Sequence, residues 1–277
     1  MSRLFKFAAL GCALLAAPAF AAGAFGSGKP ATPPAVAAKI NHTVPASLLS
    51  ALTTASKLGL GLAPPANTTL YMKAINGPRV AKGDKVGVLY VGADYCPYCA
   101  GQRWALVLSL LRFGTFDNLE YMASSARDVY ANTPTFSFQH AKYKSKYVTL
   151  TAVETADRDY HALQSMTKAQ NDIFNTFDAP PHVPQFGSIP FVYIGGQYIV
   201  YLPMVSPNML ANMDWAQIAK TLGTPSSKLY QTSMPQINAF TAAICRLDGG
   251  NPDAVCSAPG VTAANAALFH LGAQSGH

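Results

Sequence analysis

Residues 85–99 decide the fold of this chain, and they read Lys85-Val86-Gly87-Val88-Leu89-Tyr90-Val91-Gly92-Ala93-Asp94-Tyr95-Cys96-Pro97-Tyr98-Cys99. The apolar, β-branched run that ends at Val91 predicts a buried strand. Residues 100–113 contain no proline and carry apolar side chains at helical spacing, with Gly114 placed as a C-terminal cap, so they predict a helix. The two cysteines therefore lie between the end of a strand and the start of a helix.

Cys96 and Cys99 are separated by two residues, a spacing at which a cysteine pair can cycle between dithiol and disulfide. At a helix N-terminus, unpaired backbone N–H groups and the positive end of the helix dipole favour an anion and lower the pKa of a thiol. Cys96 would occupy this position, whereas Cys99 lies one turn further in and is more shielded. We therefore predict that Cys96 is the nucleophile and Cys99 the resolving thiol in thiol–disulfide exchange.

A cysteine pair at this spacing has two other roles. A structural zinc site needs four ligands, but the six histidines are scattered and Cys245 and Cys256 are eleven residues apart, which argues against a metal. An inert structural disulfide would close a very small ring and remove little entropy from the unfolded chain. Thiol–disulfide exchange, which needs no metal and no cofactor, remains the prediction, and the structural disulfide is the alternative.

A second pattern lies in residues 187–201, which read Gly187-Ser188-Ile189-Pro190-Phe191-Val192-Tyr193-Ile194-Gly195-Gly196-Gln197-Tyr198-Ile199-Val200-Tyr201. Two apolar strands flank a Gly-Gly turn, so the segment predicts a proline that leads into a β-hairpin. Thr133-Pro134-Thr135 is closer to Cys99 in the sequence than Pro190 is, but no hairpin follows it. We predict that this tripeptide belongs to an insertion loop and that Pro190 lies nearer the sulfur atoms.

A cysteine pair at a helix start, combined with a proline before a hairpin, resembles the thioredoxin superfamily. The resemblance implies that Pro190 is a cis-proline and that the backbone of Ile189 faces the disulfide and pairs with an extended substrate peptide. Pro97 and Tyr98, between the cysteines, are the other expected substrate contacts. The alternative for Pro190 is an ordinary trans-proline at the start of a strand.

A more specific resemblance covers about residues 45–260. The chain is similar to a family of exported thioredoxin-like proteins catalogued only as a domain of unknown function, through residues 90–106, 112–114, 132–138 and 188–191 and the late cysteine pair. This family implies a fold and a redox-like motif but no activity. Compared with thioredoxin, Tyr95 replaces a tryptophan and Tyr90 replaces a buried acid, so proton transfer to and from Cys99 must use another group or water.

The N-terminus predicts export. It carries Arg3 and Lys6, an apolar stretch over residues 7–17, and then Ala19-Phe20-Ala21, the small-x-small pattern of a signal peptidase site. The apolar stretch is shorter than the ~20 residues of a membrane span. We predict a signal peptide over residues 1–21, cleaved after Ala21, and a periplasmic or extracellular protein. The alternative is a lipid anchor at Cys12.

Removal of residues 1–21 lowers the formal net charge from +7 to +5 and leaves four cysteines, an even number that suits an oxidising compartment. Cys245 and Cys256 flank a turn-rich loop, and a structural disulfide between them is the preferred interpretation. Closing this loop would stabilise the fold by roughly 2.5–3 kcal/mol. The alternative is a second redox pair that relays electrons to Cys96 and Cys99.

Proline and glycine positions divide the rest of the chain. We predict a flexible Ala/Pro/Gly-rich region over residues 22–67 with a short helix at 45–58, a folded domain over 68–258 and a tail over 259–277. Further helices are expected over 162–177 and 209–222. The expected fold class is α/β: a thioredoxin-like mixed sheet flanked by helices, with an insertion between the CxxC helix and the cis-proline hairpin.

The basic residues are dispersed rather than clustered, which argues against binding of nucleic acid. Cysteine-containing proteins are the expected substrates; a membrane-bound redox partner is compatible with export, although no residue indicates one. Tyr95, Tyr98, Phe191 and Tyr193 are candidates for an apolar platform around the sulfur atoms, or else core residues. We expect an exported thiol–disulfide oxidoreductase; the competing hypothesis is a non-catalytic thioredoxin-like binding module whose CxxC disulfide is structural.

Overall fold

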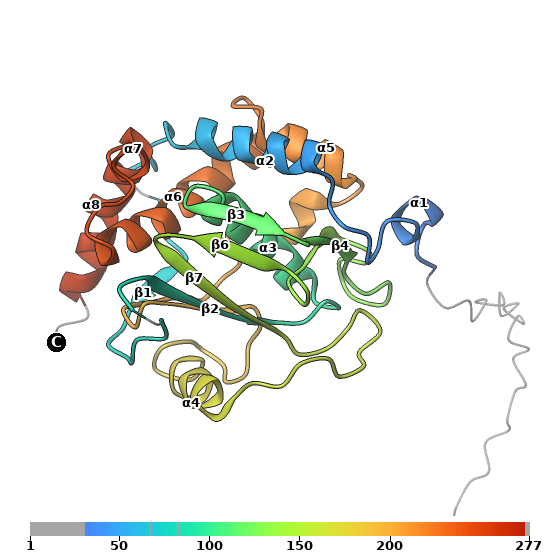
Figure 1. Ribbon diagram of the computed structural model, residues 1–277, viewed down its shortest axis with the longest axis horizontal. Helices are drawn as coiled ribbons and strands as arrows, with labels where there is room; N and C mark the ends of the chain where they lie inside the picture. The colour runs from blue at the N-terminus through green and yellow to red at the C-terminus, as the bar shows by residue number, and fades with distance from the viewer. Residues whose placement is uncertain (1–30, 67, 82, 275–277) are drawn as a thin grey trace, which may run out of the picture.

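The computed structural model describes residues 31–66, 68–81 and 83–274, and a five-stranded mixed sheet lies at its centre (Figure 1). The strands lie in the order β1-β9-β8-β2-β7, with bounds Met72–Ala74 (β1), Tyr198–Val200 (β9), Phe191–Ile194 (β8), Val86–Gly92 (β2) and Val148–Glu154 (β7). β2 and β7 are parallel, whereas every other neighbouring pair is antiparallel. This is the thioredoxin-like α/β fold that the sequence predicts.

The strand and helix predicted around the cysteines are both present. All residues of β2 are buried, as expected for a strand covered on both faces. The chain then enters α3 (Pro97–Leu110), in which every residue except Tyr98 is buried. This helix packs against the helices α2 (Ala46–Gly59) and α6 (Lys228–Leu247) and against the short strand β5 (Pro134–Ser137). The cysteines are therefore carried by an element enclosed by the rest of the fold.

The predicted insertion follows α3, but it is more ordered than a loop. It forms two antiparallel pairs, β3 (Gly114–Asp117) with β6 (Lys142–Ser145) and β4 (Glu120–Ala123) with β5. The prediction that Pro134 belongs to a loop was wrong, because this residue opens β5 opposite Ala123. A proline fits there since the first residue of an edge strand need not donate a hydrogen bond, and the Pro134 carbonyl instead accepts the indole N–H of Trp104 at 2.8 Å.

The predicted hairpin is also present, as β8 and β9. Gly195 and Gly196 form its turn with φ values of +57° and +83°, a conformation that residues with a Cβ rarely adopt. The hairpin places β8 beside β2, with Val91 opposite Phe191. The segment that precedes β8, which contains Pro190, is thereby delivered to the end of β2 where α3 begins.

Helices cover the two faces of the sheet unequally (Figure 1). α4 (Lys168–Phe177) covers one face, whereas α2, α3, α5 (Trp215–Leu222), α6 and α8 (Pro259–Gln274) lie on the other. The remaining helical segments are α1 (Pro34–Ala37), the 3₁₀ helix η1 (Pro207–Leu210) and α7 (Asp253–Cys256). The larger hydrophobic core surrounds α3, and a smaller one lies beneath α4.

Several expected boundaries differ from the structure. The helix expected over residues 162–177 begins at Lys168, because the amides of Leu163 and Gln164 instead bond to the carbonyls of Thr155 and Glu154, and Thr167 caps the helix. The helix expected over residues 209–222 is divided into η1 and α5. In the region expected to be flexible, α2 over residues 46–59 confirms the short helix expected at 45–58, whereas α1 over residues 34–37 was not expected.

The C-terminal part is a packed structure rather than a tail. Cys245 and Cys256 form a disulfide that joins the end of α6 to α7, as preferred from the sequence. Residues 259–274 form α8, whose Val261, Ala264 and Leu268 are buried against the core that includes α6. Within the described residues, no helix combines the length and hydropathy needed to cross a bilayer. The predicted signal peptide, its cleavage site at Ala21 and the alternative lipid site at Cys12 lie outside the described residues.

Arg112, just beyond α3, holds three helices together. It is buried, and it donates to the carbonyl and hydroxyl of Ser56 at 3.0 and 3.2 Å, to the Asn238 amide oxygen at 2.8 Å and to the Thr241 hydroxyl at 2.6 Å. These acceptors lie on α2 and α6 and are all uncharged. Burial lowers the pKa of this guanidinium to about 9.

We predict that Arg112→Ala lowers the free energy of unfolding by about 3 kcal/mol or more, because it leaves buried acceptors on two helices without a donor. Urea unfolding measures this change. The exposed Arg79 is the control, and Arg79→Ala should change the stability by less than about 0.5 kcal/mol. Equal stability of the two variants would contradict the role assigned to Arg112.

Candidate functional site

The two cysteines lie at the predicted position, the first turn of α3. Cys96 is the N-cap residue, and its Sγ accepts a hydrogen bond from the Cys99 amide at 3.2 Å. Pro97 occupies the first helical position, where its missing N–H has no intrahelical partner to lose. Both cysteines are free thiols, with Cys96 5% exposed and Cys99 completely buried. The thiol nearer the surface is thus the one at the helix N-terminus.

The surroundings of the two thiols shift their pKa values in opposite directions. The pKa of Cys96 is lowered, mainly by a hydrogen bond from the Cys99 side chain and further by backbone amides and by Arg103, against the effect of burial. The pKa of Cys99 is raised well above its usual value by burial and by the hydrogen bond to Cys96. The thiolate will therefore form at Cys96 first, as the sequence predicts.

The loop before β8 lies against Cys96. The peptide bond between Ile189 and Pro190 is cis, as the resemblance implied, and the Cys96 thiol points to the Ile189 carbonyl with a sulfur–oxygen distance of 3.8 Å. Thr135, in the tripeptide Thr133-Pro134-Thr135, instead donates its hydroxyl to the Ala100 carbonyl at 2.9 Å. Ile189 thus supplies the main-chain group beside the sulfur atom.

A buried charged cluster that the sequence analysis missed lies behind Cys99. Arg103, one helical turn after Cys99, donates to both Glu154 carboxylate oxygens at 2.9 and 2.6 Å and lies 3.3 Å from an Asp94 oxygen. These three side chains are at most 1% exposed. Glu154 also accepts the Phe138 amide at 3.2 Å, and Asp94 accepts the Ser137 hydroxyl at 3.2 Å. The cluster joins α3 to the ends of β2 and β7.

Tyr90, which replaces the buried acid of thioredoxin, lies beside the same charged cluster. The Arg103 guanidinium lies over its ring at 5.8 Å, and burial raises the pKa of its phenol well above the usual value. Its hydroxyl has no hydrogen-bond partner among the described residues. Tyr90 therefore stays protonated at neutral pH and cannot replace a carboxylate as proton acceptor.

Asp94 is the group of this cluster that titrates near neutral pH. Burial and the neighbouring Glu154 raise its pKa to about 7, against the opposing effects of Arg103 and Ser137. Asp94 also lines a cavity of about 470 Å³ together with Asp157, Arg158 and other residues. Asp94 is thus a buried member of the charged cluster that also lines this cavity.

The predicted aromatic platform is present only in part. Phe191 and Tyr193 are buried in the core beneath α4, the alternative considered for them. Tyr98 is 42% exposed and packs edge-on against Tyr130, and Tyr95 stacks on Tyr160 at 4.5 Å between ring centres. Of the two residues between the cysteines, Pro97 is buried, so Tyr98 presents the exposed side chain. The tyrosines at 130 and 160 come from loops far away in the sequence.

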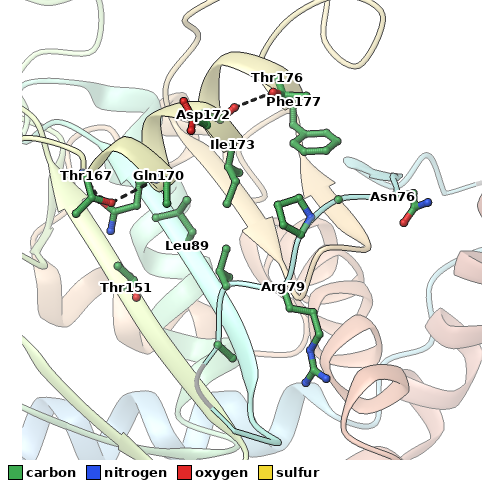
Figure 2. Close-up of a pocket in the computed structure, with 15 residues that line it drawn as sticks. Asn76, Arg79, Leu89, Thr151, Thr167, Gln170, Asp172, Ile173, Thr176 and Phe177 are labelled. Atoms are coloured by element: carbon green, nitrogen blue, oxygen red, sulfur yellow. Dashed lines mark hydrogen bonds between the residues drawn. The ribbon is translucent and has the colours of Figure 1, made fainter.

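A separate cavity lies between α4 and the segment 76–81, on the face of the sheet opposite α3 (Figure 2). It measures about 590 Å³, and Leu89, Thr151 and Ile173 are among the side chains that line it. Among the described residues that line it there is no cysteine, histidine or tyrosine, and the Asp172 carboxylate pairs with Lys168 at 2.6 Å. This cavity is separate from the sulfur atoms. In the described part of the chain, no three Cys, His, Asp or Glu side chains are grouped to hold a metal.

These features define a thioredoxin-like α/β protein with a dithiol at the start of a buried helix. A family model described as "Domain of unknown function (DUF929)" matches residues 71–173 and 158–246, and the chain belongs to this family. The matched region runs from β1 into α6 and contains Cys96, Cys99, Ile189 and Pro190. No curated protein and no solved structure matches the chain.

The pKa of Asp94 gives a prediction about stability. Its folded-state pKa of about 7 exceeds the usual 3.8, so its contribution to stability is fully present below about pH 4 and is lost as the pH rises through 7. We expect Asp94→Asn to reduce the fall in unfolding free energy between about pH 4 and 8 by up to roughly 4 kcal/mol. Urea unfolding across this range measures the effect.

The control is Asp159→Asn, which changes an exposed acid that lines the same cavity. This variant should keep the pH dependence of the wild-type protein. An unchanged pH dependence in Asp94→Asn would show that Asp94 does not titrate in this window.

Proposed function

We propose that this protein is an exported thiol–disulfide oxidoreductase of the thioredoxin superfamily that acts on cysteine-containing proteins through Cys96 and Cys99. The observation that carries the proposal is the difference between the two thiols. Cys96 is an N-cap thiol with a lowered pKa, and Cys99 is a buried thiol with a raised pKa. The backbone amide of Cys99 donates to Sγ of Cys96 at 3.2 Å. A structural disulfide has no need of this difference, whereas exchange requires one attacking and one resolving sulfur.

In the oxidising direction, a substrate thiolate attacks Sγ of Cys96 in the Cys96–Cys99 disulfide. The disulfide bond breaks as a mixed disulfide forms, and Cys99 leaves as a thiolate that takes up a proton. A second substrate thiol, once deprotonated, attacks the substrate sulfur of the mixed disulfide and releases Cys96 as a thiolate. Two electrons pass from the substrate to the protein, and the reverse sequence reduces a substrate disulfide.

The residues around the sulfur atoms support this chemistry. Arg103 lowers the pKa of both thiols and so favours whichever thiolate is leaving. Asp94, whose pKa is raised to about 7, is a carboxyl that can gain and lose a proton near neutral pH. A substrate strand would pair with the main chain at Ile189, and Tyr98 with Tyr130 would contact its side chains.

The proposal that the protein is exported rests on the signal-peptide pattern of residues 1–21. An exported location would supply the oxidising surroundings in which disulfide exchange is useful. No cofactor is required, because the electrons pass directly between sulfur atoms. A redox partner must return the pair to its starting state, and an exported protein would meet such a partner in the membrane or outside it.

The test is a trap for the mixed disulfide. In Cys99→Ala, a substrate bound to Cys96 cannot be released by the resolving thiol, so disulfide-linked adducts should accumulate on Cys96 in cells and break on reduction. Non-reducing electrophoresis and mass spectrometry of the linked peptide measure this.

The matched control is the double variant Cys96→Ala, Cys99→Ala, which should form no adducts and which keeps the disulfide between Cys245 and Cys256. If Cys99→Ala formed no more adducts than the double variant, the exchange proposal would fail and the binding-module hypothesis would stand.

A further inference from the structure

A cavity of about 500 Å³ begins at the aromatic pair beside the cysteines. Tyr130 lines this cavity, and its ring packs edge-on against Tyr98, the exposed residue between the two cysteines, at 5.9 Å between ring centres. The volume falls within the range of about 300–1,000 Å³ that is typical of ligand sites. We call this space the Tyr130 cavity. A substrate that is attached to Cys96 and passes over Tyr98 reaches it directly.

The first wall of the Tyr130 cavity belongs to the connection between β4 and β5. The Ser124 hydroxyl donates to the Tyr130 carbonyl at 2.9 Å, which fixes the main chain that carries the ring. The Ser125 amide donates to the carbonyl of Tyr95, the residue before the nucleophilic cysteine, at 2.9 Å. This wall is therefore hydrogen-bonded to the redox site itself.

The second wall is the segment around α1, which contributes Pro33 and Val36. Arg158 joins this wall to the first one. Its guanidinium donates to the Thr32 hydroxyl and to the Asn132 side-chain oxygen, both at 2.9 Å. Two segments that are far apart in the sequence are thus held together by one side chain.

The third wall is the link between η1 and α5, residues 211–214, and it carries a negative charge. Asp214 is exposed and caps α5, because its Oδ1 accepts the Gln217 amide at 2.8 Å, while Oδ2 has no hydrogen-bond partner among the described residues. No lysine or arginine is among the described residues that line the cavity, and Lys39 lies over the ring of Trp215 instead. The charge of Asp214 is therefore available to a cationic ligand group.

The exposure of Val129, in the first wall, is not explained by the fold. Its side chain is 69% exposed, more than any other large apolar side chain exposed in the described part of the chain. Tyr98, on the other side of Tyr130, is exposed as well. Because hydrogen bonds fix the connection that carries Val129, these side chains form a rigid apolar surface beside a reactive group. Such a surface is typical of a contact with a partner.

The position of the cavity indicates which partner this is. In the proposed reaction the molecule attached to Cys96 is a polypeptide, so the segment beside its reacting cysteine lies closest to the Tyr130 cavity. An apolar surface favours apolar side chains, and the carboxylate of Asp214 favours a lysine or arginine.

We propose that the Tyr130 cavity is a second contact site for polypeptide substrates and that it selects substrates with apolar side chains and a basic residue near the reacting cysteine. The apolar side chains cover Val129 and Tyr98, and the basic residue donates to Oδ2 of Asp214. This inference rests on the proposed function and adds the class of substrate. The electrons still pass only between sulfur atoms, so the cavity affects binding of the substrate and not the exchange step.

The test compares three fluorescent peptides as reductants of the Cys96–Cys99 disulfide in the chain from Ala22 onward. All contain the same two cysteines, which are flanked on both sides by leucines and lysines, by leucines and glutamates, or by glycines and serines. Single-turnover reductions with peptide in excess measure the half-saturating peptide concentration and the maximal rate. We expect the leucine–lysine peptide to half-saturate at a concentration about three- to tenfold below that of the glycine–serine peptide, and below that of the leucine–glutamate peptide.

Two substitutions separate the apolar contact from the charged one. Val129→Ser should raise the half-saturating concentration of both leucine-containing peptides about two- to fivefold, because apolar contact area is lost. Asp214→Asn should raise that of the leucine–lysine peptide alone, about two- to fivefold at low salt and less at high salt. Asparagine is also a good N-cap residue, so α5 should keep its cap. Maximal rates should not change in either variant.

The matched controls are Leu58→Ser and Asp84→Asn. They change an exposed apolar side chain and an exposed acid that do not line the Tyr130 cavity. Both variants should reproduce the wild-type values for all three peptides.

The outcomes separate this inference from the function it rests on. Equal half-saturating concentrations for the three peptides, or a peptide preference that neither Val129→Ser nor Asp214→Asn changes, overturn the inference, while reduction by dithiothreitol shows that exchange at Cys96 is intact. Selectivity that emerges only after residues 22–30 are deleted assigns the cavity to this chain's own N-terminal segment, and a dimer that Val129→Ser dissociates in sedimentation assigns it to a second copy; either result overturns the inference. A disulfide that neither the peptides nor dithiothreitol reduces overturns the proposed function and this inference together.

Discussion

The pairing of Arg103 with Glu154 is the interaction on which the rest of the structure depends. α3 runs through the interior with almost every side chain buried, and a buried guanidinium without a counter-ion would cost several kcal/mol. Glu154 supplies that counter-ion from the end of β7, and Asp94 lies beside it at the end of β2. Because Arg103 follows Cys99 by one helical turn, the ion pair also fixes the helix start that carries the cysteines relative to both parallel strands.

The same arrangement explains how two thiols three residues apart acquire different properties. The helix start presents its free amides to Cys96 and withdraws Cys99 into the interior, where burial raises its pKa. The hairpin of β8 and β9 pairs with β2 and brings the Ile189 carbonyl to Cys96. Three elements thus converge on one sulfur atom, although each is positioned by contacts that lie away from it.

The features that the sequence predicts are those with local causes. A strand-to-helix junction, a capping cysteine, a proline before a Gly-Gly turn and a short cysteine-bounded loop can each be recognised within about fifteen residues. The charged cluster was missed because Arg103 and Glu154 are 51 residues apart. The available signal was Arg103 itself, a charged residue one helical turn after Cys99 in a helix with no other charge. Pro134 in β5 and the packing of α8 were missed for the same reason, since both depend on distant partners.

If exchange occurs at this site, Cys96 and Cys99 must form a reversible dithiol–disulfide couple, which a redox titration measures. The chain from Ala22 onward is equilibrated in glutathione buffers, free thiols are trapped by alkylation, and the modified cysteines are assigned by mass. We expect Cys96 and Cys99 to titrate together as a two-electron pair, at a potential between about −120 and −270 mV, while Cys245 and Cys256 stay oxidised. A disulfide between Cys96 and Cys99 that stays oxidised in every buffer would contradict it.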